Sequence, residues 1–412
     1  MYPLTPRTCL FAGACLAFAV GPTPFRGATS PGVSIPPLPT MDAIKAPPGW
    51  VPDGNLPRQI PPALLRLPRT NITRAKYPAI DFHVHAGGLN SPAAYEKAVR
   101  LMDQVGLGVL INLNGGTGPA LDAVLKAGQP YRDRVVNFIT FSAEGINDPG
   151  WSEKFAAEME RGFKAGAGGL KVAKILGHTA KNPDGTYIQA DDPRLDAVWE
   201  MAAKYDKPIL IHLGDSIGRY YPISQLNERY EAGLWHRPGD TRENYYNNGS
   251  PSYETIERAR ENIHRKHPRT RFVNAHMGML YYDPAKLATF LDTFPNATID
   301  IAATFQDLGR APRLWREFLI KYQDRVVMGT DGNLNRGVDE FWTPHWRTLE
   351  TYDEYFEHPA QIRLETGAPA HGRWNISGLG LPDDVLRKIY YQNALRHLPA
   401  LRASLEKQLA AR

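Results

Sequence analysis

The stretch Asp81-Phe82-His83-Val84-His85 decides how the rest of this 412-residue chain is interpreted. Side chains alternate between the two faces of a β-strand, so His83 and His85 share one face and Phe82 and Val84 the other. Two glycines, Gly87 and Gly88, follow closely and favour a turn at the end of the strand. Two imidazoles on one face at a strand end form half of a metal site. A lone His-x-His pair is also common on protein surfaces, so the later strands must decide.

From residue 79 onward, a short apolar run, a glycine-rich or polar turn and a helical segment recur. This alternation predicts an α/β protein with a (β/α)8 TIM barrel, whose active site lies at the C-terminal ends of the strands. An open doubly wound sheet would also alternate, but no Gly-x-Gly-x-x-Gly follows the first strand. The expected strands are 80–85, 108–113, 134–141, 169–173, 208–213, 271–276, 297–302 and 325–330. The expected helices include 91–105, 151–165, 193–205, 253–266, 284–294 and 312–322.

Two connections at the expected catalytic end are too long to be simple turns. Residues 214–252 follow the fifth expected strand, and residues 332–381 follow the eighth. We expect these long loops to form lids or substrate walls, although a purely structural rim explains them equally well. Glu228 in the first loop is a candidate substrate contact or support for a site residue, and a solvated charge is the alternative.

Composition is that of a globular protein, with 42% hydrophobic and 22% charged residues. The net charge of +5 is small for this length, and the basic residues are not grouped into runs. These features give no support to nucleic-acid binding. The partner we expect is a small-molecule substrate.

Residues 1–25 have the features of an export signal peptide. Arg7 supplies a positive charge, residues 9–20 form a short apolar run, and Ala17 and Ala19 are small residues suited to cleavage. We expect cleavage near Ala19 rather than lipid attachment at Cys15, giving a periplasmic or extracellular protein with no integral membrane span. Both cysteines lie in this segment, so the mature chain would have no disulfide and no zinc–thiolate site.

Residues 26–75 are expected to form a proline-rich arm or linker before a barrel domain at 76–412. The stretch 31–70 holds 11 of the 35 prolines and shows little hydrophobic periodicity. Such an arm could wrap around a second subunit, which leaves a homo-oligomer open.

Four of the 12 histidines and one aspartate fall at the ends of expected strands. His83 and His85 end the first strand, His212 the fifth and His276 the sixth, and Asp331 follows the eighth. The C-terminal ends of barrel strands converge on one opening, so we expect these side chains to meet. Neutral imidazoles and a carboxylate are the ligands that Zn²⁺ and similar ions prefer. Together they predict a divalent metal site.

The ordered set of motifs around these residues resembles the amidohydrolase superfamily. The matching segments are 81–85, 211–215, 274–278 and 328–331, followed by Ile389-Tyr-Tyr-Gln-Asn393-Ala-Leu-Arg near the C-terminus. Within the superfamily, the chain looks most like the relatives of aminocarboxymuconate-semialdehyde decarboxylase, from about residue 77 to the end. The resemblance implies a barrel that holds a divalent metal, with Zn²⁺ the expected ion, through His83, His85, His212 and Asp331. It also implies that His276 contacts substrate or the nucleophilic water.

Asp331 has a second expected role as a catalytic residue. An aspartate beside a metal-activated water can accept its proton and deliver it to the leaving group. The alternative is a cap for the turn that follows. Asp81 shares the face of the two histidines and could orient one of them. Eight further histidines are expected on the surface or in loops: His178, His236, His264, His267, His345, His358, His371 and His397.

Lys171 has the opposite parity to Leu170 and Val172 in the fourth expected strand, so we expect it to face into the barrel. Some amidohydrolases carry a carbamylated lysine on this strand that bridges two metals. The decarboxylase-like branch uses one metal, and a basic residue here can hold a substrate carboxylate. We favour the substrate or supporting role narrowly, and a structural pairing with the carboxylates is a third reading.

Three functions fit these residues. The first is a metal-dependent hydrolase that uses a metal-activated water to cleave a C–N or C–O bond of an amide, lactone or ester. The second is a metal-dependent, non-oxidative decarboxylase of an aromatic or unsaturated acid, built from the same ligands. The third is a non-catalytic secreted binding protein. The complete ligand set argues against the third, and the expected export mildly favours hydrolysis.

Overall fold

The computed structural model describes residues 33–34, 63–221, 245–246, 248–335, 337–359, 372 and 374–411. The expected export signal, most of the proline-rich arm, and Glu228 lie outside these residues. Among the helices of the described part, none combines the length and the apolar character needed to cross a membrane.

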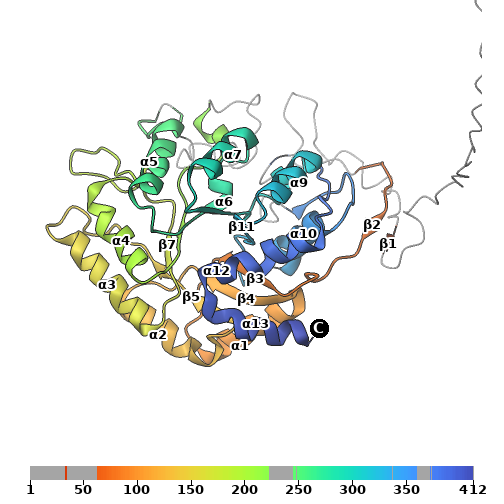
Figure 1. Cartoon of the computed structure of the whole chain (residues 1–412), viewed down its shortest axis with the longest axis horizontal. Coiled ribbons are helices and arrows are strands. Elements are labelled where there is room, and N and C mark those ends of the chain that lie inside the picture. The colour runs from red at the N-terminus through yellow and green to blue at the C-terminus, as the bar shows by residue number, and fades with distance from the viewer. Residues whose placement is uncertain are drawn as a thin grey trace, which may run out of the picture.

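Parallel strands lie at the centre of the molecule and helices surround them (Figure 1). The first sheet has the order β3, β4, β5 and the second the order β6, β7, β8, β9, β10, β11. β5 and β6 belong to one expected strand that is interrupted at Phe138. The bounds are β3 Ala79–Val84, β4 Leu107–Asn112, β5 Val135–Asn137, β6 Ile139–Thr140, β7 Leu170–Val172, β8 Ile209–Ile211, β9 Phe272–Asn274, β10 Ala297–Asp300 and β11 Val326–Val327.

The ladder is not continuous between β11 and β3, and single backbone hydrogen bonds join these two edges. The amide of Phe82 donates to the carbonyl of Met328 at 2.9 Å, and the amide of Asp331 donates to the carbonyl of His83 at 2.9 Å. The eight expected strands are therefore confirmed, and the fold is the expected (β/α)8 TIM barrel. A short antiparallel pair, β1 (Val33–Ser34) and β2 (Arg69–Thr70), lies outside it.

The helices between the strands begin where local capping chemistry predicts. Ser91 accepts a hydrogen bond from the amide of Ala94 before α1, and Ser252 caps α5 through the amide of Thr255. Proline in the first turn favours the start of several of them. These helices are α1 Pro92–Val105, α2 Gly118–Gly128, α3 Trp151–Ala165, α4 Asp196–Lys204, α5 Tyr253–Lys266, α7 Pro284–Thr293 and α9 Pro312–Lys321. Shorter or later helices are α6 Ala275–Gly278, α8 Phe305–Leu308, α11 Asp383–Arg387, α12 Asn393–His397 and α13 Arg402–Ala410.

The expected loop after the eighth strand contains a helix, α10 (Val338–Glu350). Pro344 inside the segment argues for a loop, but two tryptophans on one helical face override that preference. Trp342 and Trp346 are fully buried, and the indole N–H of Trp346 donates to the carbonyl of Val105 at 3.1 Å. α10 thus packs against the end of α1 and covers one edge of the barrel.

Three histidines expected on the surface or in loops lie buried on helices instead. His264, His345 and His397 expose 1%, 1% and 7% of their area. The ring of His264 packs 4.9 Å from Phe272 and 5.1 Å from Phe290, measured between ring centroids. The expectation was wrong because a neutral imidazole can be buried as an aromatic side chain.

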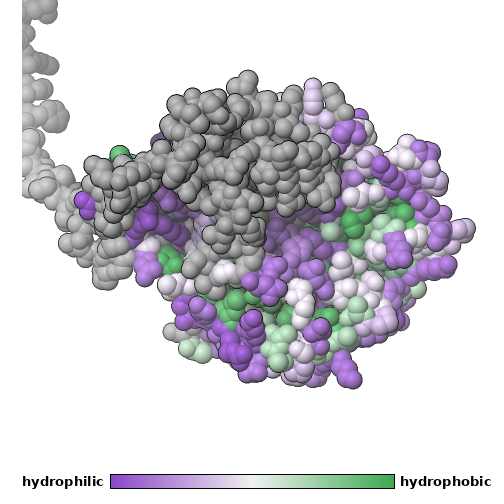
Figure 2. Space-filling view, turned by 180° about the vertical axis from the view of Figure 1, so that it is seen from behind, coloured by the Kyte–Doolittle hydropathy of each residue, from purple (hydrophilic) through white to green (hydrophobic). Residues whose placement is uncertain are grey.

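The last helix, α13, lies next to the barrel strand β4 (Figure 1). The side chain of Gln408 donates to the carbonyl of Gly108 at 3.3 Å. On the described part of the opposite face, hydrophobic residues are interspersed among hydrophilic ones (Figure 2).

Candidate metal centre

His83 lies at the end of β3 and is held in one tautomer by a buried carboxylate. Its Nδ1 lies 2.7 Å from Oδ2 of Asp300 on β10, and both side chains have no exposed area. An ionised carboxylate only accepts hydrogen bonds, so Nδ1 carries the hydrogen and Nε2 carries the lone pair. Burial also lowers the pKa of His83 well below its ordinary value, which favours the neutral ring. A neutral imidazole with a free Nε2 lone pair is the form that binds metal.

The Nε2 atom of His83 faces the other candidate ligands. It lies 3.3 Å from Oδ1 of Asp331, and the same oxygen lies 3.2 Å from Nε2 of His85. Ligand atoms of His83, His276 and Asp331 all lie within 4.8 Å of one another. The strand ends therefore bring together residues that are far apart in the sequence, as the barrel fold predicts.

His212 and His276 extend the cluster from β8 and β9. Their ring centroids are 4.4 Å apart, and the ring of His276 is 4.9 Å from that of His83. Nδ1 of His276 lies 2.7 Å from the carbonyl of Ala302, so its lone pair is also at Nε2. Nε2 of His212 is shielded from solvent and has no hydrogen-bond partner in the part of the chain described here. A buried polar atom without a partner is costly, so this nitrogen points to a missing ligand.

Asp331 is placed by the backbone and kept ionised by its neighbours. Its φ of 61° lies in the left-handed region, which a non-glycine residue rarely adopts. Burial raises the pKa of Asp331, but the imidazoles of His83 and His85 outweigh it and hold the pKa below its ordinary value. The site therefore offers one carboxylate beside the imidazole nitrogens.

Lys171 faces into the barrel, as its parity predicts. The side chain is 1% exposed, and Nζ lies 3.1 Å from Nε2 of His83. Burial lowers the pKa of Lys171 to about 8. The charged form of the lysine therefore predominates at pH 7. The uncharged amine is nevertheless more populated than in an exposed lysine.

Asp300 is the site residue that the sequence prediction missed. Besides His83, its Oδ1 accepts from the amides of His276 at 2.7 Å and Ala302 at 3.0 Å. Burial raises the pKa of Asp300, and His276 opposes that rise. An acidic residue between Ile299 and Ile301 in an apolar strand was the available signal.

Asp81 lies on the predicted face but contacts different groups. It accepts from the hydroxyl of Thr330 at 2.6 Å and the indole of Trp342 at 3.0 Å. Burial raises the pKa of Asp81 to about 7. Within the described residues, the carboxylate that orients His83 is Asp300, and Asp81 ties β3 to the segment after β11.

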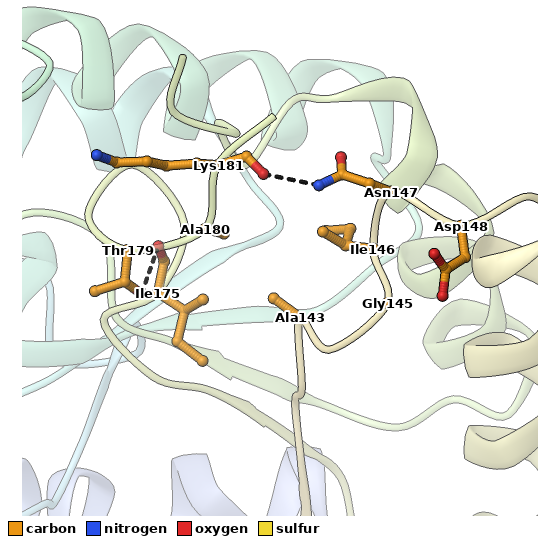
Figure 3. A pocket seen from close by; sticks show the side chains of 9 residues that line it. All are labelled: Ala143, Gly145, Ile146, Asn147, Asp148, Ile175, Thr179, Ala180 and Lys181. Carbon is orange, nitrogen blue, oxygen red and sulfur yellow. Dashed lines mark hydrogen bonds between the residues drawn. The ribbon is translucent and has the colours of Figure 1, made fainter. Parts of the chain in front are cut away.

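A pocket of about 410 Å³ opens between the loops that follow β6 and β7 (Figure 3). These loops leave from the C-terminal ends of the strands, which is the end that carries the histidine cluster. The pocket has apolar side chains such as Ile146 and Ile175 beside the polar Asp148 and Lys181. None of the candidate ligands lines it.

Comparisons with known proteins match this chain to one family model and to several solved structures. A family model described as Amidohydrolase matches residues 120–400, which is more than half of the chain. No curated protein matches. The 2,6-dihydroxybenzoate decarboxylase from Rhizobium is 17% identical, with 79% of this chain and 99% of that chain covered and a TM-score of 0.45. The 4-oxalomesaconate hydratase from Rhodopseudomonas palustris is 14% identical, with 80% and 98% covered and a TM-score of 0.46.

Proposed function

The chain belongs to the amidohydrolase family, a family of enzymes, and from that premise we propose that it is a metal-dependent hydrolase. The reaction we propose is cleavage of a C–N or C–O bond in a small amide, lactone or ester. The observation that carries the proposal is the convergence of side chains at the strand ends. Ligand atoms of His83, His276 and Asp331 lie within 4.8 Å of one another. His85 adjoins them 3.2 Å from Asp331, and the ring of His212 lies 4.4 Å from that of His276.

We propose His83, His85, His212 and Asp331 as the ligands of one divalent cation, with Zn²⁺ as the expected ion. The residues fit such an ion, because His83 presents a neutral Nε2 and Nε2 of His212 lacks any partner among the described residues. When bound, a divalent cation supplies Lewis-acid polarisation and lowers the pKa of water to about 7.

The side chains of the chain itself would move the proton and hold the substrate. Asp331 is kept ionised by His83 and His85, so it can accept the proton of the attacking water and later return it to the leaving atom. Nε2 of His276 carries a lone pair because Nδ1 donates to the carbonyl of Ala302. That nitrogen can accept a hydrogen bond from the water or from substrate and so fix its orientation.

A decarboxylase is the second candidate, and Lys171 is the observation that favours it. The buried Nζ lies 3.1 Å from Nε2 of His83, and burial lowers the Lys171 pKa only to about 8. A cation at this position can hold a substrate carboxylate against the site. The same residues would then catalyse the loss of CO₂ from an aromatic or unsaturated acid.

Product analysis separates the two reactions. The Zn²⁺-loaded protein would be incubated with a panel of amides, lactones and esters, and separately with hydroxybenzoates while CO₂ is measured. Hydrolysis that is lost in Asp331→Asn supports the proposal. CO₂ release without hydrolysis would replace it with the decarboxylase. Metal bound without either product would favour a binding protein.

The number of metal ions bound per chain, in wild type and in Lys171→Ala, decides the role of the lysine. About one ion per chain, unchanged by the substitution, agrees with a substrate or supporting role. Two ions falling to one or none would make Lys171 a carbamylated bridge between metals. The measurement is elemental analysis on protein of known concentration.

A further inference from the structure

The turn that carries His276 has an unusual backbone. After β9, four consecutive residues have positive φ angles: His276 at 54°, Met277 at 55°, Gly278 at 62° and Met279 at 60°. Each non-glycine residue in this region costs about 1–2 kcal/mol relative to a right-handed conformation. The surrounding structure must therefore hold the turn, because the chain would not adopt it alone.

Two side chains of helix α5 hold the turn by donating hydrogen bonds to the backbone carbonyls of the turn. The hydroxyl of Tyr253 donates to the carbonyl of Met279 at 2.5 Å, and the guanidinium of Arg260 donates to the carbonyl of Gly278. Tyr253 and Arg260 are each 3% exposed, and the turn itself is buried. Water cannot replace these donors, so losing either one would leave a buried carbonyl unsatisfied.

The side chain of Arg260 is itself held by its neighbours. Tyr253, Glu257 and Arg260 lie four and three residues apart, so they share one face of α5. The guanidinium carbon of Arg260 lies 5.1 Å from the ring centroid of Phe290. The Nη2 atom of Arg260 lies 3.8 Å from Oε1 of Glu257. Lys286 contacts the other oxygen of Glu257 at 2.5 Å. These contacts keep the guanidinium of Arg260 on the face of α5 that meets the turn.

The opposite side of the turn is held by β10. The amide of His276 donates to Asp300, and Nδ1 of His276 donates to the carbonyl of Ala302, both at 2.7 Å. Helix α5 holds the backbone of the turn, and β10 with the residues after it holds the imidazole. Together these contacts determine where Nε2 of His276 points. Without the contacts from α5, the turn would be held from the β10 side alone and its strained backbone could relax.

We infer that Tyr253 and Arg260 are positioning residues for His276, acting through the carbonyls of Met279 and Gly278. Their side chains bond to the backbone of the turn, and their effect is to keep Nδ1 of His276 bonded to Ala302 and Nε2 available as an acceptor. The catalytic consequence rests on the proposed function, but the orientation of the ring does not.

The test is the tautomer of His276, read by NMR of the whole chain labelled with ¹⁵N-histidine. The His276 signal is assigned by its loss in His276→Gln. Wild type should show a single tautomer protonated at Nδ1. Tyr253→Phe and Arg260→Met should each show a mixture of tautomers, whereas Arg260→Lys, which keeps a donor for Gly278, should recover most of the single form. Arg265→Met on the same helix is the control, because its side chain is 61% exposed.

Activity supplies a second readout once a substrate is known. We expect kcat to fall by about 10–100-fold in Tyr253→Phe and Arg260→Met with little change in KM, as for supporting residues elsewhere. If Arg260→Met does not fold, Tyr253→Phe carries the test, since it removes one hydroxyl only. A single, unchanged Nδ1 tautomer in folded Tyr253→Phe would overturn the inference. The NMR signal needs no substrate. A failure of this inference can therefore be distinguished from a failure of the hydrolase proposal.

Discussion

Replacing Asp300 with asparagine tests the role of this buried carboxylate most sharply. Three N–H groups donate to it: Nδ1 of His83 and the amides of His276 and Ala302, at 2.7, 2.7 and 3.0 Å. Asparagine keeps one oxygen for the two amides but places an NH₂ group opposite Nδ1. His83 must then move its hydrogen to Nε2, which removes the lone pair that faces Asp331. One charge-assisted hydrogen bond is lost, so the free energy of unfolding should fall by about 1.5–3 kcal/mol.

The metal affinity of Asp300→Asn should fall by about 10–100-fold, because the imidazole no longer presents its lone pair. Competition between the protein and a chromogenic Zn²⁺ chelator measures this affinity, and urea unfolding measures stability separately. Asp353→Asn is the matched control. Asp353 also accepts several partly buried hydrogen bonds, from Thr70 and Arg347, but it contacts no imidazole within the described residues. Wild-type affinity in folded Asp300→Asn would refute the reasoning.

Two further predictions concern stability. A Cβ added at Gly115 would lie 2.2 Å from the carbonyl oxygen of Phe138, so Gly115→Ala should lower the unfolding free energy measured in urea by about 1–3 kcal/mol. Gly87→Ala, with nothing within 4 Å, should change little, and equal effects would contradict the contact. Burial lowers the pKa of His264 to about 3. The unfolded chain therefore binds more protons below pH 6.5, and stability should fall by about 1.4 kcal/mol for each pH unit from there to about 3. His264→Phe should reduce that slope in urea unfolding at several pH values, and an unchanged slope would contradict it.

The barrel could be predicted because its signals are local. Each strand is a short apolar run, and most of the following helices begin at a cap or a proline that can be recognised in sequence. The alternation of side chains along a strand is sufficient to place Lys171 inside the barrel. The topology of parallel strands then requires that residues such as His83, His276 and Asp331 approach one another.

The remaining features depend on contacts between distant parts of the chain. The left-handed turn at His276 is stabilised by α5 and β10, and its own sequence carries only Gly278 as a signal. The partner of His83 could have been Asp81 or Asp300 by composition alone, and only the register of β10 selects Asp300. α10 forms despite Pro344 because burial of Trp342 and Trp346 outweighs the local cost.

The measurement that tests the central claim most directly is the number of Zn²⁺ ions bound per folded chain, in wild type and in His85→Ala. The side chain of His85 is 37% exposed, so its removal should leave the fold intact. We predict about one ion bound by wild type and a strongly reduced occupancy in His85→Ala at equal folded concentration. Wild-type protein that binds no ion when Zn²⁺ is supplied would contradict the account.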